Sequence, residues 1–158
     1  MPKLQELELG ENEIASLKGG LTNMNDLRKL SFAKNKLTSL EDLPRLPSLK
    51  NLVLSENQIA ELKQLYHLNR NHIRQLDILE NPLVAEKADA FKLELLIAVS
   101  ETNSALRKLN EEDVTDEDYT NAKNEKAERI KNEEIARREA AEKAALGDAP
   151  VEEAPVDE

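Results

Sequence analysis

Cysteine and tryptophan are both absent from the 158-residue sequence, and aromatic residues make up only 3% of it. Without cysteine the chain has no disulfide framework, no thiolate ligand for zinc and no thiol nucleophile. Glycine and proline number 4 and 6, too few for a linker-like chain. No apolar run approaches the roughly 18 residues that span a bilayer, and the N-terminus lacks a basic region followed by an apolar run. We therefore expect no membrane helix and no signal peptide.

Residues that could support catalysis or bind a cofactor are also scarce. The only histidines, His67 and His72, have no obvious metal partner in the sequence. The segment 18–20 (KGG) lacks the spacing of a phosphate-binding loop. The net charge of −10 and the pI near 4.9 argue against binding to a phosphate backbone. We expect a non-catalytic protein without metal or cofactor, and without direct contact to nucleic acid.

A ladder of apolar residues that ends in asparagine and one further apolar residue occurs four times. The asparagines follow one another at intervals of 23, 22 and 24 residues, within the roughly 20–29-residue period of leucine-rich repeats. The pattern predicts an α/β leucine-rich-repeat solenoid of four repeats, with short parallel strands on its concave side. The ladders are Leu4, Leu7, Leu9, Asn12, Ile14; Leu27, Leu30, Phe32, Asn35, Leu37; Leu49, Leu52, Leu54, Asn57, Ile59; and Ile73, Leu76, Ile78, Asn81, Leu83.

The asparagines have a structural explanation. Each repeat is too small to bury its apolar side alone, so the chain must turn sharply inside a stack of repeats. Such a turn leaves buried backbone groups that need partners, and an asparagine amide offers both donors and an acceptor. We expect the stacked asparagines to tie each turn to the next, as a structural ladder of Asn12, Asn35, Asn57 and Asn81.

The return paths between the ladders carry apolar residues at steps of three, as in Leu43, Leu46 and Leu49. Steps of three suit 3₁₀ turns or short helical turns. Pro44 and Pro47 disfavour a long helix in the second return path. We therefore expect tight convex segments and a curved solenoid.

Past Asn81 the pattern changes to that of a closing cap. Phe91, Leu95 and Val99 share one face of a predicted helix. The last apolar face of a solenoid needs a polar lid, and this helix suits that role. The predicted segments are four repeats over 1–84, a C-terminal helical cap over 85–115, an extended charged helix over 116–146 and a disordered acidic tail over 147–158.

The predicted charged helix has interleaved charges and no wide apolar stripe. Thr115 suits its N-cap, and acidic residues occupy the first turn. The helix is either a solvated, self-supporting element or one laid along a partner. Because it has no stripe to bury, we expect residues 119–158 to add little to the stability of the repeats. Acid-first pairs at i,i+4 support it: Glu125–Arg129, Glu133–Arg137, Glu134–Arg138 and Glu139–Lys143.

The ladders resemble the 22-residue class of leucine-rich repeats found in a protein phosphatase regulatory subunit. The block after them resembles the cap of that class, although the segment SETNSAL replaces its Leu-Pro step. A cap that runs into a charged helix is similar to the leucine-rich radial spoke proteins of ciliary axonemes. The first resemblance covers residues 1–115, and the second depends mostly on residues 76–140. In the cap, Asn81-Pro82 match the family's Asn-Pro, Phe91-Lys92 stand for its Tyr-Arg, and Leu109-Asn110 for its Leu-Asp.

Binding is expected on the concave side, where residues between the ladder leucines face outward; plain solvent exposure is the alternative. A second expected interface is the N-terminal end at Leu4 and Leu7. No capping helix precedes these residues, so we expect another chain or preceding repeats to cover them. The predicted concave binding residues are Glu6, Glu8, Lys29, Ser31, Asn51, Val53, Gln75 and Asp77.

These features predict a protein–protein interaction and scaffold subunit of a multi-subunit assembly. The resemblance implies a cytoplasmic protein of the cilium or flagellum, in an axonemal assembly such as the radial spoke. The alternative is a nuclear leucine-rich regulator, of the acidic phosphoprotein or spliceosomal-partner type. That alternative calls for a far more acidic tail or an RNA-protein-binding groove, so the mixed-sign helix favours the cilium. Phosphatase targeting, a third role, usually involves more repeats than four.

Overall fold

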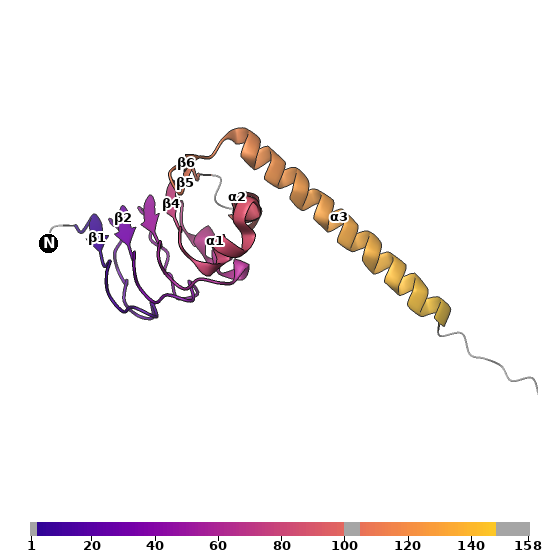
Figure 1. The fold of residues 1–158 in the computed structure, drawn as a ribbon, viewed down its shortest axis with the longest axis horizontal. Helices are drawn as coiled ribbons and strands as arrows, with labels where there is room; N and C mark the ends of the chain where they lie inside the picture. The colour runs from indigo at the N-terminus through magenta and orange to yellow at the C-terminus, as the bar shows by residue number, and fades with distance from the viewer. Residues whose placement is uncertain (1–2, 100–104, 148–158) are drawn as a thin grey trace, which may run out of the picture. The chain divides into compact units, whose positions relative to one another are not determined.

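The computed structural model describes residues 3–99 and 105–147, so the predicted acidic tail, apart from Gly147, lies outside it. Six strands form one sheet in the order β1 to β6, in which the first five are parallel (Figure 1). This is the predicted solenoid with short parallel strands. The strands are β1 (Glu6–Glu8), β2 (Lys29–Ser31), β3 (Asn51–Val53), β4 (Gln75–Asp77), β5 (Lys108–Leu109) and β6 (Glu112–Asp113).

Each of the first four strands has three residues, and the middle one is a ladder leucine. The strands pair in register, so Leu30, Leu52 and Leu76 lie in one row. All three are buried. Because side chains alternate between the two faces of a strand, the residues on either side of each leucine point away from the core.

A sharp turn follows each of these strands and contains a residue with positive φ. Glu11, Lys34, Glu56 and Glu80 have φ angles of 57°, 56°, 54° and 54°. A residue with a Cβ is strained in this left-handed region, so surrounding contacts must hold the turn. The next residue is the ladder asparagine in every case. Its hydrogen bonds to the turn therefore stabilise a backbone conformation that the preceding side chain disfavours.

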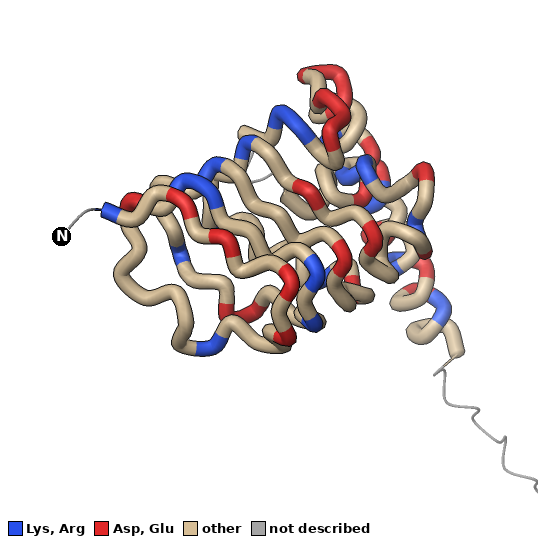
Figure 2. Tube along the Cα trace, turned by 60° about the vertical axis from the view of Figure 1, so that its left-hand side comes forward, with Lys and Arg blue, Asp and Glu red and all other residues tan. Residues whose placement is uncertain are grey.

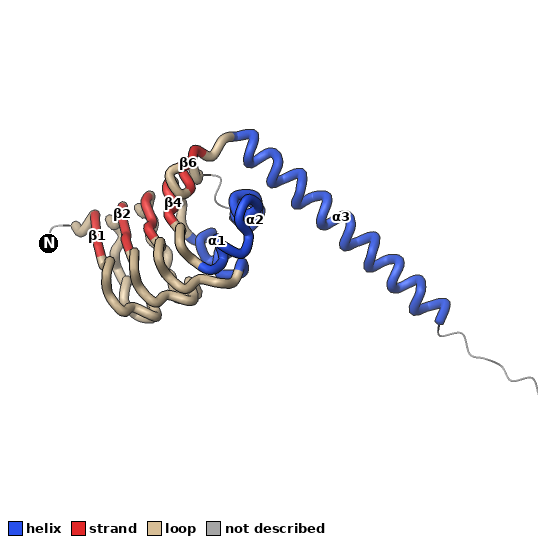
Figure 3. The backbone as a smooth tube through the Cα atoms, viewed as in Figure 1, coloured by secondary structure: helices blue, strands red, loops and turns tan. Residues whose placement is uncertain are grey.

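The return paths contain regular helix only from the third repeat onward (Figure 3). The third path forms the 3₁₀ helix η1 (Leu62–Arg70), as its apolar steps of three predict. The first two paths contain turns, and Pro44 and Pro47 lie in the second. After the fourth ladder, helix α1 (Pro82–Lys87) begins with proline at its first position, where the missing N–H costs nothing.

The cap helix is more deeply buried than the sequence predicts. Helix α2 (Phe91–Val99) follows the short 3₁₀ helix η2 (Ala88–Ala90) and packs against η1. Besides Phe91, all residues from 95 to 99 are buried, whereas a single apolar face was expected. The buried residues of α2 belong to the core, while Lys92, Leu93 and Glu94 on its other side are half-buried. The position of α2 after the last ladder agrees with a cap, and its role as a lid stays a prediction.

Three apolar residues after the cap helix, which form a last half-ladder, join the sheet as an additional rung. Leu106, Leu109 and Val114 are all buried in the core of the solenoid. Strand β5 pairs with β4, and β6 pairs antiparallel with β5. This closing hairpin was not predicted, because two-residue strands are too short to show an alternating pattern.

The chain divides into two compact units, Met1–Lys123 and Asn124–Glu158. Helix α3 (Asp116–Gly147), close to the predicted bounds, begins in the first unit. Within the second unit, residues 127–147 are all exposed, as expected for a helix supported by its own charges. Within residues 3–99 and 105–147, no helix is both long and apolar enough to cross a membrane.

Candidate protein-binding surface

The concave face is formed by the first and third residues of β1 to β4. The structure places all eight predicted binding residues at these positions, and each is exposed or half-buried. Their binding role stays a prediction. They form two rows across the sheet: Glu6, Lys29, Asn51 and Gln75 in the first, and Glu8, Ser31, Val53 and Asp77 in the second.

A hollow of about 520 Å³ lies on the concave face over β3 and β4. Leu52 and Leu76 line its floor but are buried, so Val53 is the apolar side chain in the hollow that a partner can reach. Asn51, Gln75 and charged side chains also line it. Interfaces between proteins likewise combine apolar contacts with polar ones. The charged residues at the rim are Lys29, Asp77, Lys108 and Glu111.

Ion pairs between neighbouring repeats occupy the β1–β2 end of the concave face. Lys29 Nζ lies 2.9 Å from Glu8 Oε1, and this hydrogen bond, with the charge of the carboxylate, raises the pKa of Lys29. Lys34 Nζ lies 3.2 Å from Glu11 Oε1, and the same two causes raise the pKa of Lys34. Exposed pairs of this kind contribute little to stability. They do pair Glu8 of β1 with Lys29 of β2 within the protein.

The ladder asparagines tie each turn to the repeat before it. Asn57 Oδ1 accepts a hydrogen bond from a backbone N–H of the second repeat at 3.1 Å, and Asn57 Nδ2 donates to a carbonyl there at 2.9 Å. Asn35 and Asn81 make the same two bonds to their preceding repeats. Asn12 Nδ2 donates only to carbonyls of its own turn. The ladder therefore runs backward along the chain, from each asparagine to the previous turn.

Three further amides act in the same way and were missed in the sequence. Asn110 Oδ1 accepts from a backbone N–H of the fourth turn at 2.8 Å, as a fifth rung of the ladder. On the convex side, Gln64 Oε1 accepts from Leu40 N at 2.9 Å and Asn71 Oδ1 accepts from Leu46 N at 2.6 Å. Asn110 had a signal, since it follows a leucine of the last half-ladder. Gln64 and Asn71 had none, because the convex segments share only their apolar steps and no amide recurs at one position in all three of them.

The N-terminal end of the stack exposes part of its apolar ladder. Leu4 is 48% exposed, whereas Leu27, the equivalent residue of the second repeat, is fully buried. Leu7 and Leu9 are only half-buried. The interface predicted at Leu4 and Leu7 thus has apolar side chains that a partner can reach, and its occupation stays a prediction.

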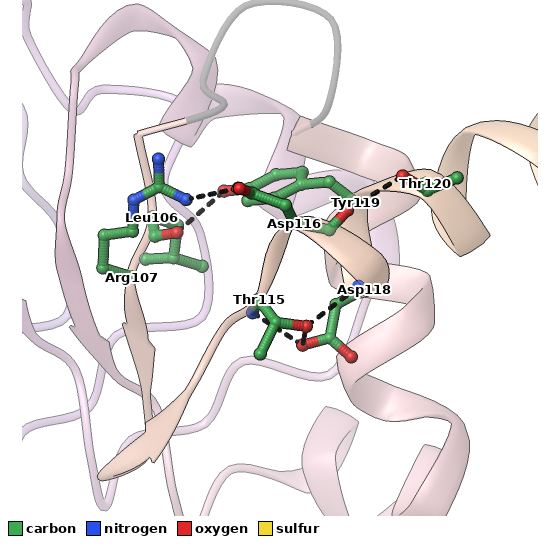
Figure 4. Close-up of polar contacts among 7 residues, drawn as sticks. All are labelled: Leu106, Arg107, Thr115, Asp116, Asp118, Tyr119 and Thr120. Atoms are coloured by element: carbon green, nitrogen blue, oxygen red, sulfur yellow. Dashed lines mark hydrogen bonds and ion pairs between the residues drawn. The ribbon is translucent and has the colours of Figure 1, made fainter.

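The first turns of α3 pack on the repeat unit, contrary to expectation. Tyr119 is 8% exposed, and its hydroxyl donates to Leu106 O at 3.0 Å (Figure 4). Ala122 is fully buried. Burial of the Tyr119 ring raises the pKa of its hydroxyl. The expectation that everything from residue 119 onward adds little stability is therefore wrong for residues 119–123, because one aromatic anchor does not require an apolar stripe.

Polar contacts hold the start of α3 in place (Figure 4). Thr115 Oγ1 accepts from Asp118 N at 3.2 Å, and the Asp118 carboxylate accepts from Thr115 N at 2.8 Å, which is a reciprocal helix cap. The hydrogen bond from the Thr115 backbone is the main cause of the lowered pKa of Asp118. Lys92 Nζ lies 3.0 Å from Asp118 Oδ2, and Arg107 Nη1 lies 3.1 Å from Asp116 Oδ1.

Neither histidine contributes to a cluster of metal-ligand type. His67 is half-buried in η1, and His72 is exposed. Among residues 3–99 and 105–147, no group of three His, Asp or Glu side chains is arranged to hold a metal ion.

Known proteins share this arrangement of repeats. A family model described as "Leucine rich repeat" matches residues 2–59. The fold is a leucine-rich-repeat solenoid. A chain in the crystal structure of the Drosophila melanogaster SNF/U2A' complex is similar in structure to this chain, with a TM-score of 0.63 and 18% sequence identity. The similarity covers 81% of this chain and 74% of that chain, and no curated protein matches in sequence. Folds of this kind are typically non-enzymatic modules for protein–protein interaction.

Proposed function

We propose that this leucine-rich-repeat protein is a non-catalytic docking subunit that holds another protein on its concave face. The observation that carries the proposal is the 520 Å³ hollow, which presents Val53 among polar and charged side chains. An apolar centre supplies most of the binding energy of an interface, and the polar rim supplies specificity. The rigid ladder beneath the hollow keeps this surface in one shape.

Replacement of Val53 by arginine tests this proposal. Val53 is the outward third residue of β3 and is half-buried, so a long charged side chain there fills the hollow without entering the core. We expect the variant to lose its protein partners while it melts at the temperature of the wild type. Thr38→Arg is the matched control, since Thr38 is β-branched, exposed and outside the hollow.

The measurement is quantitative mass spectrometry of proteins cross-linked to tagged full-length chain in its native cells. Loss of the same partners from Val53→Arg and Thr38→Arg would contradict a site on the concave face. Retention of all partners by Val53→Arg would contradict it too.

An axonemal assembly, such as the radial spoke, is one proposed setting for this docking function. Its support is the resemblance of a cap that runs into a charged helix, together with the mixed signs and full exposure of residues 127–147. A helix of this kind is suited to many weak ion pairs along a neighbouring protein.

A nuclear assembly of the spliceosomal-partner type is the second proposed setting. Its support is the structural similarity to a chain of the SNF/U2A' complex, in which the similar chain is itself bound to another protein. At 18% identity this likeness concerns the fold, so it favours a docking role more strongly than a location.

Fractionation separates the two settings. A subunit of the axoneme should stay with the insoluble fraction of detergent-stripped cilia at low salt. Release with the soluble matrix, or presence of the protein in cells that never build cilia, would exclude the axonemal setting and favour the nuclear one. Imaging of a tagged copy in the same cells supplies the second measurement.

A further inference from the structure

A column of basic residues runs along one edge of the concave face. Each is the residue immediately before a strand, from β2 to β5. They are stacked neighbours, because each donates its backbone N–H to the carbonyl of the one before, at 2.9, 2.7 and 2.8 Å. Figure 2 shows this edge as a succession of blue segments across the repeats. We call it the basic column; its members are Arg28, Lys50, Arg74 and Arg107.

The first residues of two strands add further cations, although Lys29 already pairs with Glu8. Lys29 and Lys108 lie next to the basic column, at the first positions of β2 and β5. Two positions of each strand from β1 to β5 face this edge: the residue before the strand and the first residue of the strand. Among the side chains at these positions, six are cationic and one, that of Glu6, is acidic. This concentration of positive charge lies within a chain whose net charge is −10.

The opposite ends of the strands carry the opposite charge. The last residue of each three-residue strand lies three positions after the residue that precedes the strand, which is about 10 Å at about 3.3 Å per strand residue. The positive-φ residues that follow β1 to β4 lie three positions further along the chain. One cation, Lys34, stands among six carboxylates there. We call this the acidic edge; its carboxylates are Glu8, Glu11, Glu56, Asp77, Glu80 and Glu111.

Most of the basic column lacks a counter-ion in the part of the chain that the structure describes. Arg28, Lys50 and Arg74 have no carboxylate there within ion-pair distance. Arg107 pairs with Asp116, whose side chain is 94% exposed. Neighbouring strands lie about 4.8 Å apart, and like charges placed directly opposite each other destabilise a sheet. An anionic partner would relieve that repulsion.

We propose, resting on the docking function above, that the basic column binds the acidic face of a helix in a protein partner, which lies along the stack of repeats. Carboxylates at i,i+3 and i,i+4 of a helix are about 5–6 Å apart, close to the spacing of the column. Four stacked cations span about 14 Å at 4.8 Å per strand. Ten residues of helix span about 15 Å, so three turns engage the whole column.

The acidic edge decides between a protein helix and a nucleic acid. A helix carries acids on one face and can place lysine or arginine on the flank that meets the acidic edge. RNA is negative on all sides, so phosphates held by the basic column would bring other phosphates toward the carboxylates of the acidic edge, of which Asp77 lies about 10 Å from the column. The two edges together therefore fit a helix with separated acidic and basic flanks.

The test uses the full-length chain and a fluorescent synthetic helix of about 20 residues, with glutamates at i, i+4, i+7 and i+11 and lysines on the opposite flank. A peptide of the same composition with its charges distributed around the helix is the control probe. Anisotropy at low salt should show tighter binding of the separated-charge peptide. The triple variant R28E/K50E/R74E should bind it about tenfold more weakly, at a few tenths of a kcal/mol or more per exposed pair.

The matched variant K18E/R45E/K123E changes the net charge by the same amount, at exposed positions outside the basic column. Its affinity for the separated-charge peptide should stay within about twofold of that of the wild type, because distant surface charges are screened. Equal losses in both triple variants, or equal binding of both peptides, would overturn the proposal. Tighter binding of a single-stranded RNA than of the peptide would overturn it in favour of nucleic acid.

The neutral variant R28Q/K50Q/R74Q repeats the test with less disturbance of folding. If Val53→Arg removes cellular partners while the triple variant keeps them, the docking function stands and this inference fails.

Discussion

The ladder asparagines differ in how many repeats each one joins. Asn57 bonds to its own turn and to the turn before it, and it is buried. Asn12 bonds only within its own turn and is exposed. A single residue type at one repeat position therefore makes unequal contributions along the stack, according to whether a turn precedes it.

Replacement of Asn57 by alanine should lower the free energy of unfolding by about 1–3 kcal/mol, because backbone groups of two turns lose their partners inside the protein. Asn12→Ala should cost about 0.5 kcal/mol or less, as is usual at exposed positions. Urea unfolding monitored by circular dichroism measures both. Equal losses at the two positions would contradict the backward-running ladder.

At the scale of elements, the start of α3 behaves differently from the rest of that helix. Tyr119 and Ala122 belong to the core, and the Thr115–Asp118 cap and Lys92 fix the first turn. From residue 127 to 147 the helix is fully exposed. One continuous helix thus combines a structural anchor with a solvated extension, and the division lies near the boundary of the two compact units.

Two truncations test this division. A chain that ends at Lys123 should melt at nearly the same temperature as the full chain, because it keeps every buried residue of α3. A chain that ends at Asp118 should melt about 10 °C lower, since the lost Tyr119 ring is worth about 3 kcal/mol. Scanning calorimetry compares them. Identical melting temperatures for the two truncations would show that Tyr119 stabilises nothing.

The pKa of Asp118 gives the helix start a pH dependence of defined sign. Because the pKa is lowered in the folded state, the carboxylate stabilises the protein above the pKa of an unfolded aspartate, about 3.9. That stabilisation is lost as the pH falls through the lower folded pKa.

Asp118→Asn should therefore be less stable than the wild type at neutral pH, by an amount near that of a lost helix cap, about 1 kcal/mol. The difference should shrink as the pH falls below about 3.9. Denaturant unfolding at a series of pH values measures it. A difference that is constant from neutral to acid pH would exclude a role for the charge of Asp118. Asp116→Asn is the control, because the Asp116 side chain is 94% exposed.

At the scale of the whole molecule, like charges gather along the two edges of the concave side beyond its β1–β2 end, where Lys29 and Lys34 pair with carboxylates. The basic column stacks four cations, and the acidic edge stacks Glu56 and Glu80, in a protein of net charge −10. Such an arrangement lowers the stability of the isolated protein while it prepares the surface for a partner of complementary charge.

The free energy of unfolding should consequently rise with salt, from about 0.02 to 0.3 M sodium chloride, as screening weakens the repulsion between stacked charges. Lys50→Gln removes one member of the basic column, so at low salt it should be more stable than Lys18→Gln. Both variants have the same net charge, and Lys18 is exposed outside the column. Equal stability of the two variants at every salt concentration would show that the column is not repulsive.

The repeat period and the residue types determined most of the fold. Leucines at offsets of three and two, ending in asparagine, specify a short strand followed by a turn, and only stacked copies bury such a unit. The solenoid, the parallel strands and the outward positions of residues such as Val53 followed from that pattern, and the fold is confirmed. The binding role of the outward residues stays a prediction, because a repeat pattern describes what must be buried and is silent about what binds.

Only the tertiary structure decided the contacts that cross between segments of unlike pattern. Gln64 meets the second return path, Tyr119 meets Leu106, and α2 packs against η1. None of these pairs shares a repeat position, so no period in the sequence predicts them. The basic column is a second feature that the sequence alone does not predict. Its residues occupy one repeat position, but whether like charges stack depends on the register of parallel strands, and that register is set by how distant segments pack.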